Sequence, residues 1–304
     1  MTPTPAARVP TFLPYLALAV GILSLSLSAM FVRWAEAPGP VTGFYRVFFA
    51  ACILTPFIVY RHRKKPPAQK PRLLFPLIAG IATALDFAFW NTAATYTTAA
   101  NVTLIGHTAP LWVALAGLLF FGERLKGDFW LGLVLAMSGA AIIVGSDFLL
   151  HPHLGFGDLL ALISSFFFAA YYLATERGRR SFDAPTYAWL MALLAAASLF
   201  VINLVLGYPL WGYSAQTWLA FLVAAVVAQL LGYLSVTFAL GHLPASIVSP
   251  TMIGQPVMTA LLAIPLLAEV PTTFQLIGGM IALAGIYLVN QAHSRARELS
   301  DPNR

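Results

Sequence analysis

Residues 99–123 read AANVTLIGHTAPLWVALAGLLFFGE and residues 245–269 read ASIVSPTMIGQPVMTALLAIPLLAE, an ungapped match at an offset of 146 residues. The frame continues beyond both segments and brings together residues of distinctive type. The matched pairs are Pro110 and Pro256, Glu123 and Glu269, Gly132 and Gly278, and Gly139 and Gly285. Apolar residues match often by chance, but prolines, glutamates and glycines matched in one frame indicate an internal repeat.

The composition around this repeat is that of a membrane protein. Of 304 residues, 60% are hydrophobic and 9% charged, whereas about 25% are charged in a typical soluble domain. A soluble fold of this size could not hide so much apolar surface. The net charge of +6 comes from short basic clusters between apolar runs. We interpret these clusters as topology signals facing anionic lipid headgroups rather than as a nucleic-acid-binding surface.

A spanning helix needs about 20 mostly apolar residues, and the chain holds ten such runs. They lie near residues 13–34, 40–60, 72–95, 99–121, 128–147, 156–176, 185–206, 215–240, 245–267 and 273–292. The sequence therefore predicts an all-α membrane protein of ten transmembrane helices. Residues 13–147 and 156–292 form its two five-helix repeats, and 1–12 and 293–304 its tails.

Lys and Arg give the orientation of these helices. With the N-terminus inside, fifteen of the 17 basic residues lie on the inner side, only Arg33 lies at an outer end, and Arg46 is buried in the second span. Cytoplasmic loops carry this excess of basic residues. We expect a multi-pass protein of the inner cell membrane with both termini in the cytoplasm.

Five is an odd number, so the two repeats are inserted in opposite senses. Inverted-topology repeats are typical of secondary transporters, which bind substrate near the midplane between the halves. The aligned glycines of the fifth and tenth spans are expected to let helix backbones approach closely. The pattern thus favours a transporter that works by alternating access.

An apolar span with a proline, a GERL-type ending and a glycine-punctuated following span resembles the EamA-type repeat of the drug/metabolite transporter superfamily. The first copy reads PLWVALAGLLFFGERLKGDFWLGLVLAMSGAAIIVG at 110–145, and the second reads PVMTALLAIPLLAEVPTTFQLIGGMIALAGIYLV at 256–289. Arg46 also matches an arginine common in that family. The resemblance implies a carrier that exports small metabolites, often amino acids or related compounds. Multidrug, nucleoside and sugar-like carriers of the same superfamily are the alternatives.

Ionisable residues inside a membrane span are costly and therefore point to function. At about 1.5 Å per residue, Arg46 and Asp86 both lie roughly 9 Å from the outer face, on adjacent spans. We predict a buried ion pair between them, which either fixes helix packing or also meets substrate or a proton.

A polar and aromatic layer is expected at a similar depth. We predict substrate contacts from His107, Tyr45, Trp90, Ser164 and Gln255. For each the alternative is a structural role in helix packing. Pro110 and Pro256 are predicted to interrupt their helices beside this layer, with a gating role, and to leave the carbonyls of Gly106 and Met252 unpaired.

The sequence lacks the HExxH, CxxC, GxSxG and Walker A motifs of common enzyme sites. We expect no catalytic residue, metal or cofactor, and no nucleic-acid partner. The expected partners are a small-molecule substrate, membrane lipids, and protons or an exchanged solute, with the monomer as the working unit. A membrane enzyme acting on lipid and a structural membrane subunit are the alternatives from other classes.

Overall fold

The computed structural model describes residue 10 and residues 12–64, 73–96, 105–122, 125–150, 155–267 and 273–300. These residues are folded into helices, with no β-strand among them, as an all-α protein requires. Six described helices are long and apolar enough to cross a bilayer: Leu13–Val32, Gly39–Arg63, Leu74–Ala93, Phe156–Gly178, Ala184–Leu206 and Ala215–Ala239. Three further apolar helices are shorter, at Ala109–Phe120, Gly127–Gly139 and Leu276–Ala292. The count of ten spans stays a prediction.

The first half of the chain holds α1 (Leu13–Ser26), α2 (Ser28–Ala35), α3 (Gly39–Lys64), α4 (Leu74–Tyr96), α6 (Ala109–Phe121) and α7 (Gly127–Leu150). The first predicted span is broken at Leu27, between α1 and α2. The end of α6 follows from its sequence. Gly122 adopts φ 65°, a left-handed conformation that glycine tolerates, and its N–H bonds the carbonyl of Gly117.

The second half holds α8 (Phe156–Gly178), α9 (Ala184–Leu206), α10 (Ala215–Val223), the π-helix η1 (Ala224–Tyr233), α11 (Leu234–Ala239), α12 (Ala245–Thr251), α13 (Gly254–Leu267) and α14 (Thr273–Ser300). α9 begins where the Asp183 side chain accepts a hydrogen bond from Thr186 N–H at 2.9 Å. α10, η1 and α11 form one continuous helix, because each begins at the residue after the last ends. Its middle ten residues are wound as a π-helix.

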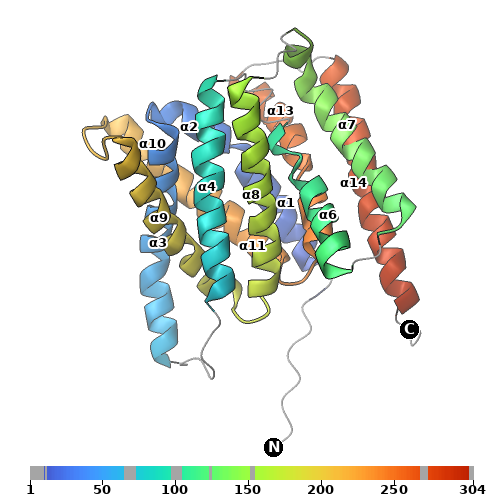
Figure 1. Ribbon diagram of the computed structural model, residues 1–304, viewed down its shortest axis with the longest axis horizontal. Helices are drawn as coiled ribbons and strands as arrows, with labels where there is room; N and C mark the ends of the chain where they lie inside the picture. The colour runs from blue at the N-terminus through green and yellow to red at the C-terminus, as the bar shows by residue number, and fades with distance from the viewer. Residues whose placement is uncertain are drawn as a thin grey trace, which may run out of the picture.

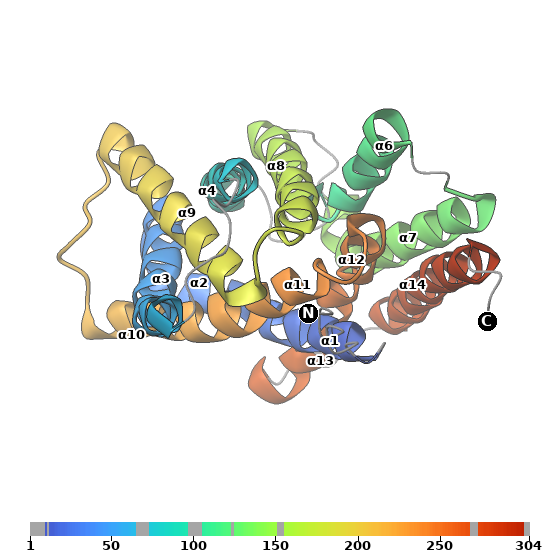
Figure 2. The ribbon, with the colours of Figure 1, turned by 90° about the horizontal axis from the view of Figure 1, so that it is seen from below.

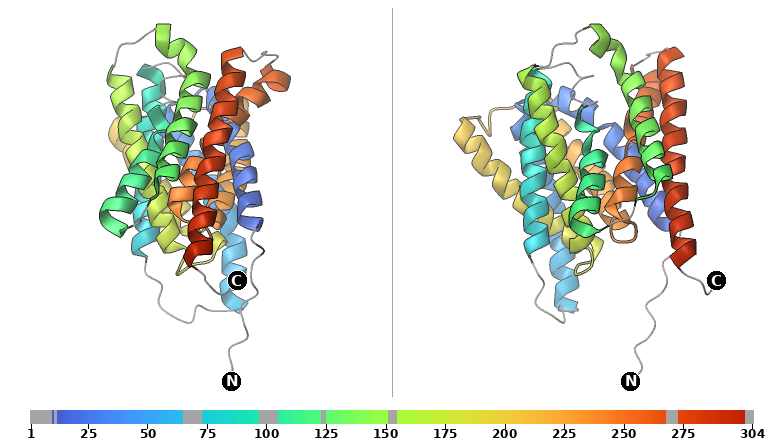
Figure 3. Two further views of the ribbon diagram at one scale, coloured as in Figure 1. Left: turned by 90° about the vertical axis from the view of Figure 1, so that its right-hand side faces the viewer. Right: turned by 45° about the vertical axis from the view of Figure 1, so that its right-hand side comes forward.

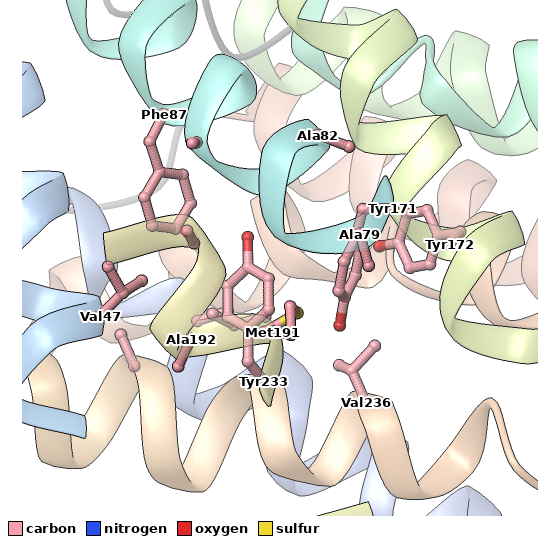
Figure 4. Packing of buried hydrophobic residues seen from close by; sticks show 14 of the residues in the cluster. Val47, Ala79, Ala82, Phe87, Tyr171, Tyr172, Met191, Ala192, Tyr233 and Val236 are labelled. Carbon is pink, nitrogen blue, oxygen red and sulfur yellow. The ribbon is translucent and has the colours of Figure 1, made fainter. Parts of the chain in front are cut away.

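The core lies where helices of the two halves meet. α4 and α8 stand side by side (Figure 1), and α1 packs against η1 and α11. Figure 4 shows the tyrosines of α8 and η1 turned toward small residues of α4, such as Ala79. Tyr171 and Tyr172 are each 1% exposed and Tyr233 is 5% exposed. Large rings from the second half therefore fill the space that alanines of the first half leave open.

α7 and α14 pack through their glycines at one edge of the molecule (Figures 2 and 3). A methyl group on Gly139 would lie 2.5 Å from the carbonyl oxygen of Gly278, and one on Gly285 would lie 2.6 Å from that of Gly132. Partner numbers fall as α7 numbers rise, so the helices are antiparallel. The contact is reciprocal, because Gly132 and Gly139 are the repeat equivalents of Gly278 and Gly285. The structure confirms the packing role predicted for these glycines.

The predicted fourth and ninth spans are each broken by a turn just before their aligned proline, and the proline lies in the first turn of the helix that follows. Pro110 lies in the first turn of α6, after a turn at 107–108, and Pro256 lies in the first turn of α13, after a turn at 252–253. The missing proline N–H is harmless there, since the first N–H groups of a helix have no intrahelical partner. The prediction of an unpaired carbonyl at Met252 was wrong, because that carbonyl accepts a hydrogen bond from Gln255 N–H at 2.9 Å.

One ion pair joins the two halves at the end of the molecule where α3 finishes. Arg61 Nη1 of α3 lies 2.5 Å from Oδ2 of Asp183, the residue that caps α9. Both side chains are partly exposed, at 47% and 38%. Pairs this exposed contribute little to stability.

Candidate functional site

Asp86 is the buried carboxylate around which the site is built. It lies on α4 with 7% exposure, and its Oδ1 accepts a hydrogen bond from the Ser164 hydroxyl at 2.6 Å. Ser164 lies on α8 and is 1% exposed. Two residues that the sequence assigned separately to the site are therefore in direct contact, and the contact joins the two halves of the chain.

The next residue of α8 points the other way, toward the start of α6. Ser165 Oγ lies 2.9 Å from Thr108 Oγ1 and accepts a hydrogen bond from Trp112 Nε1 at 2.9 Å. His107 lies next to Thr108 in the turn before α6 and is half-buried. Successive residues of a helix are rotated by about 100°, so two adjacent serines can bond two different neighbours.

Trp90 lies on α4, one helical turn beyond Asp86. Its indole faces Gly106, just before the turn at 107–108 that precedes α6. A methyl group on Gly106 would lie 3.2 Å from Nε1 of Trp90. Glycine lets the backbone before α6 approach the indole this closely. We call the resulting group the α4–α6–α8 cluster, which comprises Asp86, Trp90, His107, Thr108, Trp112, Ser164 and Ser165.

Arg46 forms a second buried polar centre, between α3 and η1. It is 7% exposed; its Nε donates to Gln229 Oε1 at 3.2 Å and its Nη1 to Ser28 Oγ at 2.9 Å. The guanidinium carbon lies 4.8 Å from the ring centre of Phe87 and 5.2 Å from that of Tyr233. Aromatic faces attract a cation at these distances. We call Arg46, Ser28, Gln229, Phe87 and Tyr233 the Arg46 cluster.

Arg46 and Asp86 do not form the ion pair that their depths predict. Neither residue takes part in the ion pairs seen in the described part of the chain, such as Arg61–Asp183 and Arg180–Glu176. The carboxylate bonds α8 and the guanidinium bonds α2 and η1. Depth along a helix can be counted in the sequence, but the direction in which a side chain leaves the helix depends on packing. The role of the two residues in substrate or proton binding stays a prediction.

Tyr45 and Gln255, also predicted to meet substrate, have other neighbours in this structure. The Tyr45 hydroxyl donates to the carbonyl of Leu210, and its ring stacks on Phe221 with centroids 4.9 Å apart. Gln255 Nε2 donates to the carbonyl of Leu25 at 3.3 Å. Neither contact involves a residue of the α4–α6–α8 cluster.

Several residues of these clusters escaped the sequence reasoning, Phe87 among them. Thr108 follows His107 directly, so the prediction could have included it. Ser28, Gln229 and Tyr233 carry no sequence signal of their own, since uncharged polar residues are common in membrane helices. A π-helix, which often occurs at functional sites, holds Gln229 and Tyr233.

The chemistry available to the two clusters is charge recognition. A buried carboxylate, a buried guanidinium and an imidazole can bind charged groups or protons, and the surrounding tryptophans and tyrosines can contact apolar parts of a ligand. Carboxylate, serine hydroxyls and indole come from three helices, α4, α6 and α8, so movement of one half against the other would alter their contacts.

Comparison with known proteins gives a consistent family. The model of the EamA-like transporter family matches residues 12–145 and again 155–291. An uncharacterised transporter of Archaeoglobus fulgidus is 28% identical over 81% of this chain and 85% of its own length. The pseudopaline exporter of Pseudomonas aeruginosa is 27% identical over 86% of this chain and 90% of that protein. The aromatic amino acid exporter of Escherichia coli is 27% identical over 83% and 87%.

A protein of known crystal structure shares the fold. It has a TM-score of 0.77 and 16% sequence identity, and the match covers 91% of this chain and 97% of that one. The family match covers nearly the whole chain in two segments. The chain belongs to the EamA-like transporter family of the drug/metabolite transporter superfamily, and it is an integral membrane transporter.

Proposed function

We propose that the protein is a secondary transporter that exports small metabolites, amino acids or related compounds, across the inner membrane by alternating access. Ten helices in two oppositely inserted halves, with both termini cytoplasmic, would carry this cycle, and the monomer would suffice for it. Relatives named as exporters of pseudopaline and of aromatic amino acids support the substrate class.

The observation that carries the proposal is an exchange of contacts between the halves. The turn before α6 in the first half is bonded to α8, the first helix of the second half, through Thr108 and Ser165 at 2.9 Å. The break before α13 in the second half is bonded to α1, the first helix of the first half, because Ser26 Oγ donates to the carbonyl of Gln255 at 3.1 Å. Two equivalent breaks, each held by the opposite half, support rocking about a shared centre.

The test is counterflow in proteoliposomes. Vesicles loaded with one unlabelled amino acid should accumulate the same labelled amino acid transiently, and vesicles without protein should not. A panel of amino acids, nucleosides and sugars covers the metabolite alternatives. Folded, reconstituted protein that gives no counterflow with any member of the panel would contradict the proposal.

His107 is the residue of the α4–α6–α8 cluster that we expect to touch substrate or a coupled proton. His107→Ala should reduce counterflow more than folded yield, and a proton-coupled component should lose its pH dependence. His242→Ala is the matched control, because its imidazole bonds Phe238 at the end of α11, outside both clusters. Equal counterflow at every pH for His107→Ala and the wild type would assign His107 to a structural role.

An exporter of lipophilic cations is the second candidate, and one observation favours it. Such a carrier needs a buried carboxylate free of a basic partner, and Asp86 is bonded to a neutral hydroxyl. A lipophilic cation such as tetraphenylphosphonium in the same counterflow panel separates the two candidates.

A further inference from the structure

Among the described residues, the buried side chains of Arg46 and Asp86 each form their hydrogen bonds with neutral partners, although a buried ion is unfavourable unless an opposite charge compensates it. Arg46 is bonded to a serine and a glutamine, and Asp86 to a serine. Both side chains are 7% exposed, so water does not replace a counter-ion. Neither centre has an opposite charge in direct contact, so a ligand could supply one to each.

Arg46 has an unused hydrogen-bond donor that could bind one more acceptor. Its Nη2 atom is buried and has no hydrogen-bond partner, while Nε and Nη1 are both engaged. A guanidinium offers five N–H donors in a planar fork that suits a carboxylate. Phe87 and Tyr233 hold the cation from the sides, with their own rings edge to face and 5.9 Å apart. The missing partner of Arg46 is an anion.

Asp86 is adjacent in sequence to a residue of the Arg46 cluster. It directly precedes Phe87 on α4, and Figure 4 shows the Phe87 ring extending from α4 toward Tyr233 of η1. The carboxylate leaves the same turn of α4 toward Ser164 of α8. A positive and a negative centre thus lie on the neighbouring helices α3 and α4, without a direct ion pair between them.

We propose that Arg46 and Asp86 form a zwitterion-binding pair, in which the guanidinium binds a ligand carboxylate and the Asp86 carboxylate binds the ammonium group of the same ligand. The inference rests on the proposed transport of amino acids and narrows it to compounds that carry both charges. A ligand with one charge would leave the other centre buried and uncompensated, and is rejected for that reason.

The experiment uses three compounds with one side chain: phenylalanine, phenylalanine amide without the carboxylate, and 3-phenylpropionate without the amine. A second triplet built on leucine repeats the test. Competition with labelled amino acid in counterflow should be about thirtyfold or more weaker for the amide and for the acid than for the amino acid, the range seen when a buried charge loses its partner. Competition by either singly charged compound as strong as that of the amino acid would overturn the proposal.

Two variants assign the charges. Arg46→Gln should weaken competition by phenylalanine and raise that of the amide relative to it, and Asp86→Asn should raise 3-phenylpropionate instead. Arg61→Gln, the same change on the same helix at a half-exposed position, should leave all three ratios unchanged. If either variant leaves the ratios of competition among the three compounds unchanged, the assignment of the two charges is overturned. If the variants do not fold, the three compounds tested on the wild-type protein still decide whether a zwitterion is required.

Failure of transport is distinct from failure of the pair. If amino acids show counterflow, and the amide or the acid inhibits it as strongly as phenylalanine does, the zwitterion-binding pair is overturned. The proposed export function is then unaffected. Folded protein without counterflow for any amino acid overturns the pair, and folded protein without counterflow for any member of the panel also overturns the proposed function.

Discussion

Ser164 and Ser165 are adjacent in sequence and serve different neighbours. Ser164 donates to Asp86 of α4, and Ser165 accepts from Trp112 of α6. Both are nearly inaccessible, with exposures of 1% and 0%. One serine pair thereby fixes α8 against two helices of the first half, and the Ser164 hydroxyl is the neutral partner of the buried carboxylate.

Ser164→Ala should destabilise the protein by about 1–3 kcal/mol, because it leaves a buried carboxylate without its hydrogen-bond donor. Thermal unfolding in detergent measures the change. Ser198→Ala is the control, since that hydroxyl only bonds the Leu194 carbonyl of its own helix at 2.9 Å, and its effect should stay within about 0.5 kcal/mol. Equal losses for the two variants would contradict the role given to Ser164.

The sequence could predict which polar residues lie inside the membrane, but not which of them touch. Counting along the spans placed Arg46, Asp86 and Ser164 at comparable depths, and all three are buried. The predicted partner of Asp86 was the nearest basic residue. The observed partner is a serine of the other half, and only the packing of α4 on α8 brings it there.

At the scale of helices, the α7–α14 contact is the one that sequence predicts best. Glycines repeated seven residues apart leave one face of each helix without side chains, so backbones can meet. The π-helix η1 and the break at Leu27 could not be predicted in this way, because neither contains a proline that would mark an irregular helix in the sequence. Their geometry arises from packing between helices, which a single sequence does not display.

Gly139→Ala should separate α7 from α14 and destabilise the protein by at least about 1–3 kcal/mol. The added carbon would lie 2.3 Å from the backbone nitrogen of Ala282, which cannot move as a flexible side chain would. Gly127→Ala on the same helix meets nothing within 4 Å and should change stability by less than about 0.5 kcal/mol. Chemical unfolding in detergent compares the pair. Equal stability of both variants would refute the close backbone contact.

At the scale of the molecule, composition and the distribution of basic residues predict a membrane protein with a defined orientation, and the repeat predicts two related halves. The structure adds that the halves interlock. α8 of the second half lies between α4 and α6 of the first (Figure 1), and the pair Arg61–Asp183 ties α3 to the start of α9. Sequence alone does not show this, because an ungapped repeat says nothing about which helix of one half packs on which helix of the other.

The opposite insertion of the two halves is the central claim, and equivalent loops test it directly. Glu36 follows the first helices of the first half, and Ser181 follows the first helix of the second; both are exposed. In a background in which the single cysteine is removed by Cys52→Ala, Glu36→Cys should react with a membrane-impermeant maleimide in intact cells. Ser181→Cys should react only after the membrane is permeabilised. Labelling of both cysteines from the same side would contradict the inverted repeat and the transport cycle built on it.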